Sequence, residues 1–141
     1  MKSLNKILKN LDLNNSEIPE VLVSGLSTNS KNIQKGDLFI AIKGNKENGN
    51  SFISEAICSG AVAVITDSSY IKSNKVPIFK IQDSRAALST IASEFYDHPS
   101  KKMTLIGITG TNGKTTTACI VKSILEKAKY KVALIGTLGL V

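Results

Sequence analysis

A short loop in the second half of the chain carries the residues whose chemistry is easiest to read. It consists of Thr109-Gly110-Thr111-Asn112-Gly113-Lys114-Thr115-Thr116. Glycines in such a loop let the backbone fold closely around a phosphate, and the amides that open the following helix point at its oxygens. Lys114 would contact the outer phosphates as a point charge, and the Thr115 hydroxyl is positioned to bind Mg²⁺. The loop therefore predicts a nucleotide site.

The spacing of this loop departs by one residue from the common phosphate-loop pattern G-x-x-x-x-G-K-[ST]. Ile108 occupies the place of the first glycine, and the glycine stands one step earlier, at Gly107. A Gly-Lys-Thr triplet alone is also compatible with a capped helix start and an exposed lysine. A predicted strand before the loop and a predicted helix after it favour nucleotide binding over that simpler interpretation.

Several other kinds of site lack the residues they need. Cys58 and Cys119 stand among apolar residues in helix-like segments, which favours buried free thiols over a disulfide or a zinc site. The single histidine, His98, precedes a proline, so a metal cluster and a cysteine–histidine pair are not expected. No apolar run reaches 18 residues, and polar residues interrupt the first helix-like stretch. We therefore expect a cytoplasmic protein without a membrane partner.

The net charge of +7 raises the question of a nucleic-acid partner. All of the basic residues except Arg85 are lysines, and they are scattered along the chain. The few aromatic residues do not alternate with them as a base-stacking surface requires. We expect no nucleic-acid partner.

A polar break containing Pro99 divides the chain into two parts of unequal length. The first part alternates helix-like and strand-like segments. Helices are expected over 4–11, over 52–57 with Ser51 as its cap, and after the cap Asp83, with Leu88, Ile91, Ala92 and Phe95 on one face. Strands are expected at 20–24, 38–42, 61–66 and 77–81. We therefore expect an α/β N-terminal domain over 1–98 and a linker over 99–102.

The second part has the order of a nucleotide-binding βαβ unit. A strand over 103–108, a helix over 114–129 and a strand from 132 are expected, with the helix directing Val121, Ile124, Leu125 and Ala128 inward. Such a short segment rarely buries enough apolar surface to fold alone. We therefore expect 103–141 to be the incomplete start of a larger ATP-binding domain.

The loop and several other segments resemble the Mur ligases. In that family the first glycine of the ATP loop is displaced as Gly107 is here. The resemblance covers about residues 20–140, and within the family it favours the ligases that add the third peptide residue. Its other segments are Lys35-Gly36-Asp37-Leu38-Phe39-Ile40-Ala41, Gly60 to Val64, Arg85 to Leu88, and Phe95-Tyr96-Asp97-His98-Pro99-Ser100.

The resemblance also implies a substrate site in the first domain, which in the family holds the UDP end of the substrate. It assigns UDP-sugar contacts to Thr28, Ser30, Asn45, Lys46 and Glu47. Two family motifs are altered around these positions. The usual Asp-Ser-Arg is Asn29-Ser30-Lys31, and the usual Asp-Gly-His is Asn48-Gly49-Asn50. Lysine keeps the charge of arginine but loses its planar, bidentate geometry.

The implied activity is ATP-dependent amide synthesis in peptidoglycan precursor formation. The substrates would be ATP with Mg²⁺, a UDP-N-acetylmuramoyl dipeptide, and diaminopimelate or lysine, with Lys114 as the catalytic residue and Thr115 as the metal ligand. A remnant that binds the UDP sugar without ligase activity is one alternative, because much of the family's machinery has no counterpart here. An unrelated small phosphate-loop NTPase is another.

Overall fold

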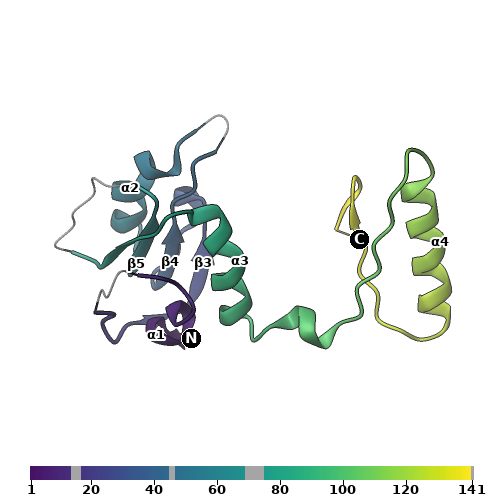
Figure 1. Cartoon of the computed structure of the whole chain (residues 1–141), viewed down its shortest axis with the longest axis horizontal. Helices are drawn as coiled ribbons and strands as arrows, with labels where there is room; N and C mark the ends of the chain where they lie inside the picture. The colour runs from purple at the N-terminus through teal and green to yellow at the C-terminus, as the bar shows by residue number, and fades with distance from the viewer. Residues whose placement is uncertain (14–16, 45–46, 69–74, 141) are drawn as a thin grey trace. The chain divides into compact units, whose positions relative to one another are not determined.

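The computed structural model describes residues 1–13, 17–44, 47–68 and 75–140. The chain forms two compact units, Met1–Lys102 and Met103–Val141. Figure 1 shows the first unit as a layered α/β structure and the second as one long helix accompanied by extended segments and a small hairpin.

A parallel sheet of four strands forms the centre of the first unit. Its strands lie in the order β3-β4-β5-β6, and each neighbouring pair is parallel. The strands are β3 Gly25–Ser27, β4 Asp37–Ile40, β5 Ala63–Thr66 and β6 Ile78–Lys80. Both central strands are buried along their whole length, as expected for a parallel sheet that is covered on both faces.

Helices cover the two faces of this sheet. α1 and α3 pack on one face, against Leu38, Ile40 and Ile65, and α2 packs on the other face, against Phe39 and Val64. Successive residues of a strand thus feed opposite cores, as the two-residue period requires. The helices are α1 Leu4–Leu8, α2 Ile53–Cys58 and α3 Ser84–Phe95. A separate antiparallel pair is formed by β1 Lys2–Ser3 and β2 Leu22–Val23. The 3-10 turns are η1 Ser30–Asn32, η2 Gly49–Phe52 and η3 Pro99–Lys102.

The α/β fold class is confirmed. Of the two predicted helix caps, Asp83 is confirmed for α3, whereas Ser51 is wrong for α2. Asp83 Oδ1 accepts hydrogen bonds from two backbone amides of the first turn of α3, at 2.8 and 3.0 Å. Ser51 does not cap α2, because it lies inside the 3-10 turn that precedes this helix. Asn48 begins that turn, its Oδ1 accepting a hydrogen bond from the amide of Asn50 at 3.1 Å.

The first strand of the sheet lies later in the chain than the sequence predicts. The strand expected over 20–24 contains β2, which pairs with β1 outside the four-stranded sheet. That sheet takes up the chain only at Gly25, which pairs with Asp37 of β4. A Cβ on Gly25 would come within 2.5 Å of the Asp37 carboxylate. Glycine at this position therefore lets β3 lie directly beside β4.

The second unit differs from the predicted βαβ arrangement. It consists of α4 Lys114–Lys127 and an antiparallel pair, β7 Ile135–Gly136 with β8 Gly139–Leu140. The strand expected over 103–108 is not formed, and the strand expected from 132 begins only at Ile135. A strand requires a neighbour for its hydrogen bonds, and among the described residues no strand pairs with 103–108.

No described residue of the second unit is buried. The prediction that α4 buries four apolar side chains is therefore wrong. Ile124 is 60% exposed and Ala128 is exposed, whereas Val121 and Leu125 are partly covered. A helix buries its apolar stripe only against another layer, and the described part of this unit supplies only the short hairpin and the extended segments beside it.

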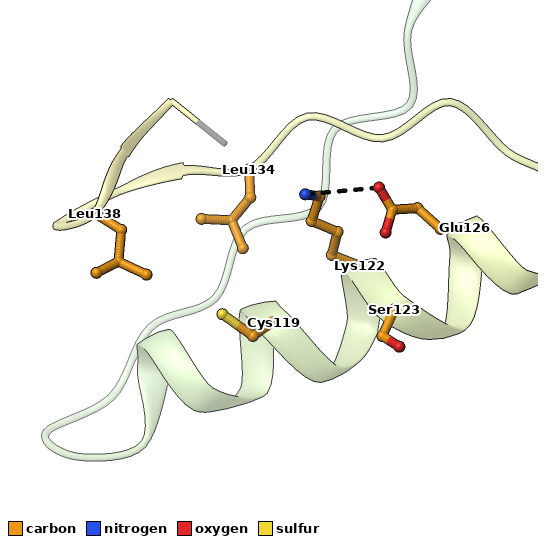
Figure 2. Close-up of a pocket in the computed structure, with 6 residues that line it drawn as sticks. All are labelled: Cys119, Lys122, Ser123, Glu126, Leu134 and Leu138. Carbon is orange, nitrogen blue, oxygen red and sulfur yellow. Dashed lines mark ion pairs between the residues drawn. The ribbon is translucent and has the colours of Figure 1, made fainter.

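Both cysteines are exposed, which corrects the prediction of buried thiols. Cys58 is the last residue of α2 and follows Ile53, which faces the core, by five positions. At about 100° per residue, it lies roughly 140° around the helix from Ile53. Cys119 lies on α4, toward Leu134 and Leu138 (Figure 2), in the unit that has no buried residue among those described.

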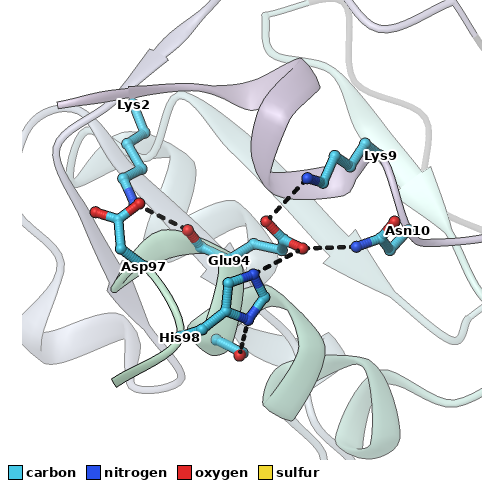
Figure 3. Close-up of polar contacts among 7 residues, drawn as sticks. Lys2, Lys9, Asn10, Glu94, Asp97 and His98 are labelled. Carbon is cyan, nitrogen blue, oxygen red and sulfur yellow. Dashed lines mark hydrogen bonds and ion pairs between the residues drawn. The ribbon is translucent and has the colours of Figure 1, made fainter. Parts of the chain in front are cut away.

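The segment directly after α3 is joined to the start of the chain by an ion pair (Figure 3). Lys2 Nζ lies 2.6 Å from Asp97 Oδ1. The hydrogen bond from Lys2, supported by the charges of Lys2, Lys6 and Lys102, lowers the pKa of Asp97 below its ordinary value of 3.8.

This lowered pKa predicts a specific loss of stability in acid. Because the pKa is lower in the folded state, the Asp97 contribution is complete above pH 3.8 and disappears as the pH falls through the folded value. Asp97→Asn should therefore reduce the free energy of unfolding more at pH 6 than at pH 2. Urea unfolding at the two pH values measures this, and an equal loss at both would contradict it.

Candidate functional site

The phosphate loop leads into α4 through a glycine in the left-handed region. Gly113 is the N-cap of α4 and has φ 73° and ψ 0°, and Gly110 has φ 151°. Side chains other than glycine adopt such values rarely. An added Cβ at Gly113 would meet nothing within 4 Å, so the positive φ, rather than crowding, explains this glycine.

Lys114 lies over its own loop. Its Nζ donates to the carbonyl oxygens of Gly110, at 2.6 Å, and Thr111, at 3.1 Å. These bonds hold the ammonium group against the loop. Residues 109–117 are all exposed, and α4 has no acidic residue in its first turn. The loop thus combines a cation with the partial positive charge of a helix N-terminus, which suits a polyphosphate.

The Thr115 hydroxyl is a hard oxygen donor of the type that Mg²⁺ prefers. It lies at the start of α4, exposed, with its Oγ1 3.4 Å from Oγ1 of Thr137. Thr115 therefore fits the predicted role by its chemistry. Within the described ranges no group of three or more His, Cys, Asp or Glu side chains is arranged to hold a metal ion.

The predicted substrate residues belong to loops at the carboxyl edge of the sheet. Because β3 to β6 are parallel, the loops that follow them open at the same edge, which is the usual ligand side of such sheets. Thr28 follows β3 and is exposed, and Glu47 lies, also exposed, in the loop after β4. Asn45 and Lys46 lie outside the described residues.

Ser30 is the predicted substrate residue with the most defined environment. It is 5% exposed, and its Oγ donates to Glu55 Oε2 on α2 at 2.8 Å. The neighbouring Asn29 begins the turn η1 by accepting a hydrogen bond from the amide of Lys31 at 3.0 Å. The first predicted loop is thus attached to α2, and Glu55 is a residue that the sequence analysis did not identify.

The second predicted loop is closed by backbone contacts. The amide of Gly49 donates to the carbonyl of Ile42 at 2.9 Å, and the amide of Gly44 donates to the carbonyl of Glu47 at 2.9 Å. A Cβ at Gly49 would lie 2.6 Å from the oxygen and 2.7 Å from the nitrogen of Ile42. Glycine is therefore required for this close approach.

A side-chain network anchors the end of this loop, and the sequence analysis missed it. Thr66 Oγ1 donates to Asn50 Oδ1 at 2.5 Å, and Asn50 Nδ2 donates to Asp67 Oδ1 at 2.9 Å. Ser84, which is fully buried, completes the network with a 3.3 Å bond to Asp67 Oδ2. The available signal was the polar pair Thr66-Asp67 at the end of a buried strand. Asn50 thus serves to hold the loop.

Two surface hollows are lined by residues other than the predicted site residues. One of about 250 Å³ lies beside α4, is lined by Cys119, Leu134, Leu138 and the ion pair Lys122–Glu126 (Figure 2), and includes no residue of the phosphate loop. A second, of about 540 Å³, lies between β6 and the first half of α3. Neither hollow is lined by a predicted site residue.

Comparison with known proteins identifies the family. The model described as "Mur ligase family, catalytic domain" matches residues 22–96, and "Mur ligase middle domain" matches residues 108–141. The chain belongs to the Mur ligase family. The first match contains the loops at the carboxyl edge of the sheet, and the second contains the phosphate loop of this Mur ligase chain.

Two curated relatives of this Mur ligase chain carry the name UDP-N-acetylmuramoyl-L-alanyl-D-glutamate--2,6-diaminopimelate ligase. The protein of Caldanaerobacter subterraneus subsp. tengcongensis is 48% identical over 120 residues, which are 85% of this chain and 25% of the relative. The protein of Clostridium tetani is 41% identical over 140 residues, or 96% of this chain and 29% of the relative. The chain thus spans about a quarter of the length of these relatives.

Solved structures agree with the family assignment of this Mur ligase chain. A MurF ligase from Thermotoga maritima, solved in complex with ADP, has 34% identity and a TM-score of 0.60 over 74% of this chain and 24% of its own. A UDP-N-acetylmuramoyl-L-alanyl-D-glutamate--2,6-diaminopimelate ligase has 22% identity and a TM-score of 0.71 over 99% of this chain and 28% of its own. The second likeness concerns the fold alone. No described helix is long and apolar enough to span a membrane.

Proposed function

We propose that this chain supplies the UDP-substrate loops and the phosphate loop of an ATP-dependent amide ligase. That ligase adds diaminopimelate to UDP-N-acetylmuramoyl-L-alanyl-D-glutamate during peptidoglycan precursor synthesis. The observation that carries the proposal is the 41% identity over 140 residues to a ligase with that name, because this match spans both units. ATP and UDP-linked sugars are cytoplasmic molecules, so we assign the reaction to the cytoplasm.

The chemistry of the phosphate loop supports a carboxylate-activating ligase. A substrate carboxylate oxygen attacks the γ-phosphorus of ATP, the bond to the β-phosphate oxygen breaks, and an acyl phosphate and ADP form. The amine then attacks the acyl carbon, phosphate leaves, and the nitrogen loses a proton to give the amide. Lys114 exchanges its bonds to the loop carbonyls for the phosphate oxygens and offsets charge on the transferring group.

Two further roles belong to the proposal. The Thr115 hydroxyl would hold Mg²⁺, which, when bound, neutralises charge on the nucleotide phosphates. Thr28, Ser30 and Glu47, with Asn45 and Lys46, would contact the UDP sugar, so substrate and nucleotide are bound by different units. Glu55 would hold Ser30 in position through their 2.8 Å hydrogen bond.

The decisive experiment supplies the intact protein with ATP, Mg²⁺ and UDP-N-acetylmuramoyl-L-alanyl-D-glutamate, and adds diaminopimelate or lysine in parallel reactions. The expected result is phosphate release together with a product heavier by one diaminopimelate, detected by mass spectrometry. Binding of the nucleotide sugar without turnover would favour a binding remnant. ATP hydrolysis that does not depend on the muramyl substrate would favour an unrelated NTPase.

Ser30→Ala tests the substrate loops. The change removes a hydroxyl from the predicted site and leaves Glu55 without that donor. We expect binding of the UDP-muramyl dipeptide to weaken by about 1 kcal/mol, or roughly fivefold, as for one neutral hydrogen bond. Titration calorimetry measures the change, and Ser54→Ala on the exposed face of α2 is the matched control. Unchanged binding in Ser30→Ala would exclude Ser30 from the site.

A further inference from the structure

Glu94 is a buried carboxylate that joins three separate parts of the first unit (Figure 3). It lies in the last turn of α3 and is 4% exposed. Its Oε1 accepts a hydrogen bond from Asn10 Nδ2 at 2.6 Å and lies 3.4 Å from His98 Nε2, and its Oε2 lies 3.4 Å from Lys9 Nζ. The partners come from the chain following α1 and from the first residues after α3.

Lys2 adds a second connection at the same place. Its Nζ donates to the backbone carbonyl of Glu94 at 2.9 Å and contacts the Asp97 carboxylate. We call Lys2, Lys9, Asn10, Glu94, Asp97 and His98 the Glu94 cluster. The cluster thus joins residues at the beginning of the chain to the segment by which the chain leaves the unit.

The backbone of that segment is held in an uncommon conformation. Asp97 and His98 have φ angles of 59° and 51°, in the left-handed region that residues other than glycine rarely occupy. Such residues persist where surrounding contacts hold them. The amide of His98 donates to the carbonyl of Ser93 at 2.8 Å, and the amide of Lys101 donates to the carbonyl of His98 at 3.0 Å.

We propose that the Glu94 cluster is a clamp that fixes the path by which the chain leaves the first unit, and that Glu94 is a positioning residue for the ligase reaction. The Glu94 carboxylate is buried, whereas the Lys9 side chain is half-exposed. Burying a charge is costly, so such a contact contributes little net stability, and its best-supported use is to specify one arrangement among several. The second statement rests on the proposed function: the substrate that carries the reacting carboxylate is bound through its UDP sugar by the first unit and ATP by the second, so a defined connection between the units favours the reactive encounter.

Hydrogen exchange tests the clamp without any assay of activity. Glu94→Gln keeps the size of the side chain and an acceptor for Asn10 but removes the charge. The amides of His98 and Lys101 should exchange at least about tenfold faster, whereas the amide of Val64, which bonds to Pro77 in the sheet, should not change. Glu17→Gln, at an exposed carboxylate, makes the same chemical change as a control.

Single-molecule energy transfer provides a second readout. The two cysteines of the sequence are exposed and lie one in each unit, so dyes on Cys58 and Cys119 report the distance between the units. Glu94→Gln should broaden the distance distribution, and Glu17→Gln should leave it unchanged. If Glu94→Gln does not fold, Lys9→Gln, which removes one arm of the cluster, should produce a smaller change in the same direction.

The proposal is overturned if the folded variant exchanges its His98 and Lys101 amides at the wild-type rate. It is also overturned if these amides accelerate only together with Val64, because the cluster would then act on global stability. In the ligase assay, Glu94→Gln should lower kcat and leave KM for ATP and for the UDP substrate unchanged. A wild-type protein without ligase activity would refute the proposed function, whereas the exchange measurement would still decide whether the clamp exists.

Discussion

Lys114→Ala is expected to lower the ATP-dependent rate by about 10²–10³-fold and to leave binding of the UDP-muramyl dipeptide unchanged. The rate falls because the ammonium group is the cation that the structure places on the loop, 2.6 Å from the carbonyl of Gly110. Loss of one charge-stabilising donor commonly costs an enzyme a factor of this size. Binding is retained because the predicted substrate loops belong to the other unit.

Two measurements check this expectation. Phosphate release at saturating substrate gives the rate, and titration calorimetry with the UDP-muramyl dipeptide gives the affinity. Lys127→Ala is the matched control, because it removes the same charge from the last turn of α4, away from the loop. Equal losses of rate and affinity in Lys114→Ala would contradict the division of ATP and substrate between the two units.

Gly49→Ala should produce the opposite pattern, with weak binding of the UDP substrate and normal affinity for ATP. The new Cβ would lie 2.6 Å from a backbone oxygen of Ile42, so the loop must move away from this residue, which follows β4. Accommodating an extra methyl group in a tightly packed place costs about 1–3 kcal/mol. If this cost falls on the substrate-binding arrangement, affinity decreases by about 5- to 150-fold.

The control for this variant is Gly136→Ala, where the nearest atom to an added Cβ is a flexible side-chain carbon of Leu134 at 3.9 Å. The melting temperature of each variant separates a displaced loop from an unfolded unit. Normal substrate affinity in a folded Gly49→Ala protein would mean that the loop after β4 does not contact the UDP sugar.

Much of the first unit could be predicted from its sequence because local signals agree with the tertiary structure. The run Leu38-Phe39-Ile40 is apolar throughout, and the strand it forms is buried between helical layers. Asp83 precedes an amphipathic helix and caps it. The phosphate loop likewise carries its chemistry in consecutive residues, so Lys114 and Thr115 could be singled out without a structure.

The remaining features depend on contacts between residues far apart in the chain. Glu55 lies 25 positions after Ser30, and Glu94 lies 84 positions after Asn10. A single carboxylate in a helix gives no indication of such a partner. Asn50 was identified only as a departure from a motif, and its bonds to Thr66 and Asp67 follow from the packing of two strand ends.

The errors in the second unit have a common physical cause. An apolar stretch such as 103–108 predicts a strand, and Ile124 on a helix predicts burial, but both outcomes require another layer. The described residues 103–140 provide neither a partner strand nor a covering sheet for these segments.

The unequal burial of the two units also determines how the chain should respond to heat. The heat capacity of unfolding arises mainly from apolar surface that becomes exposed to water. In the described chain all fully buried apolar side chains belong to the first unit. The calorimetric transition of this chain should therefore report the melting of that unit. Its unfolding enthalpy and heat-capacity change should correspond to about 100 residues rather than to the 141 in the sequence.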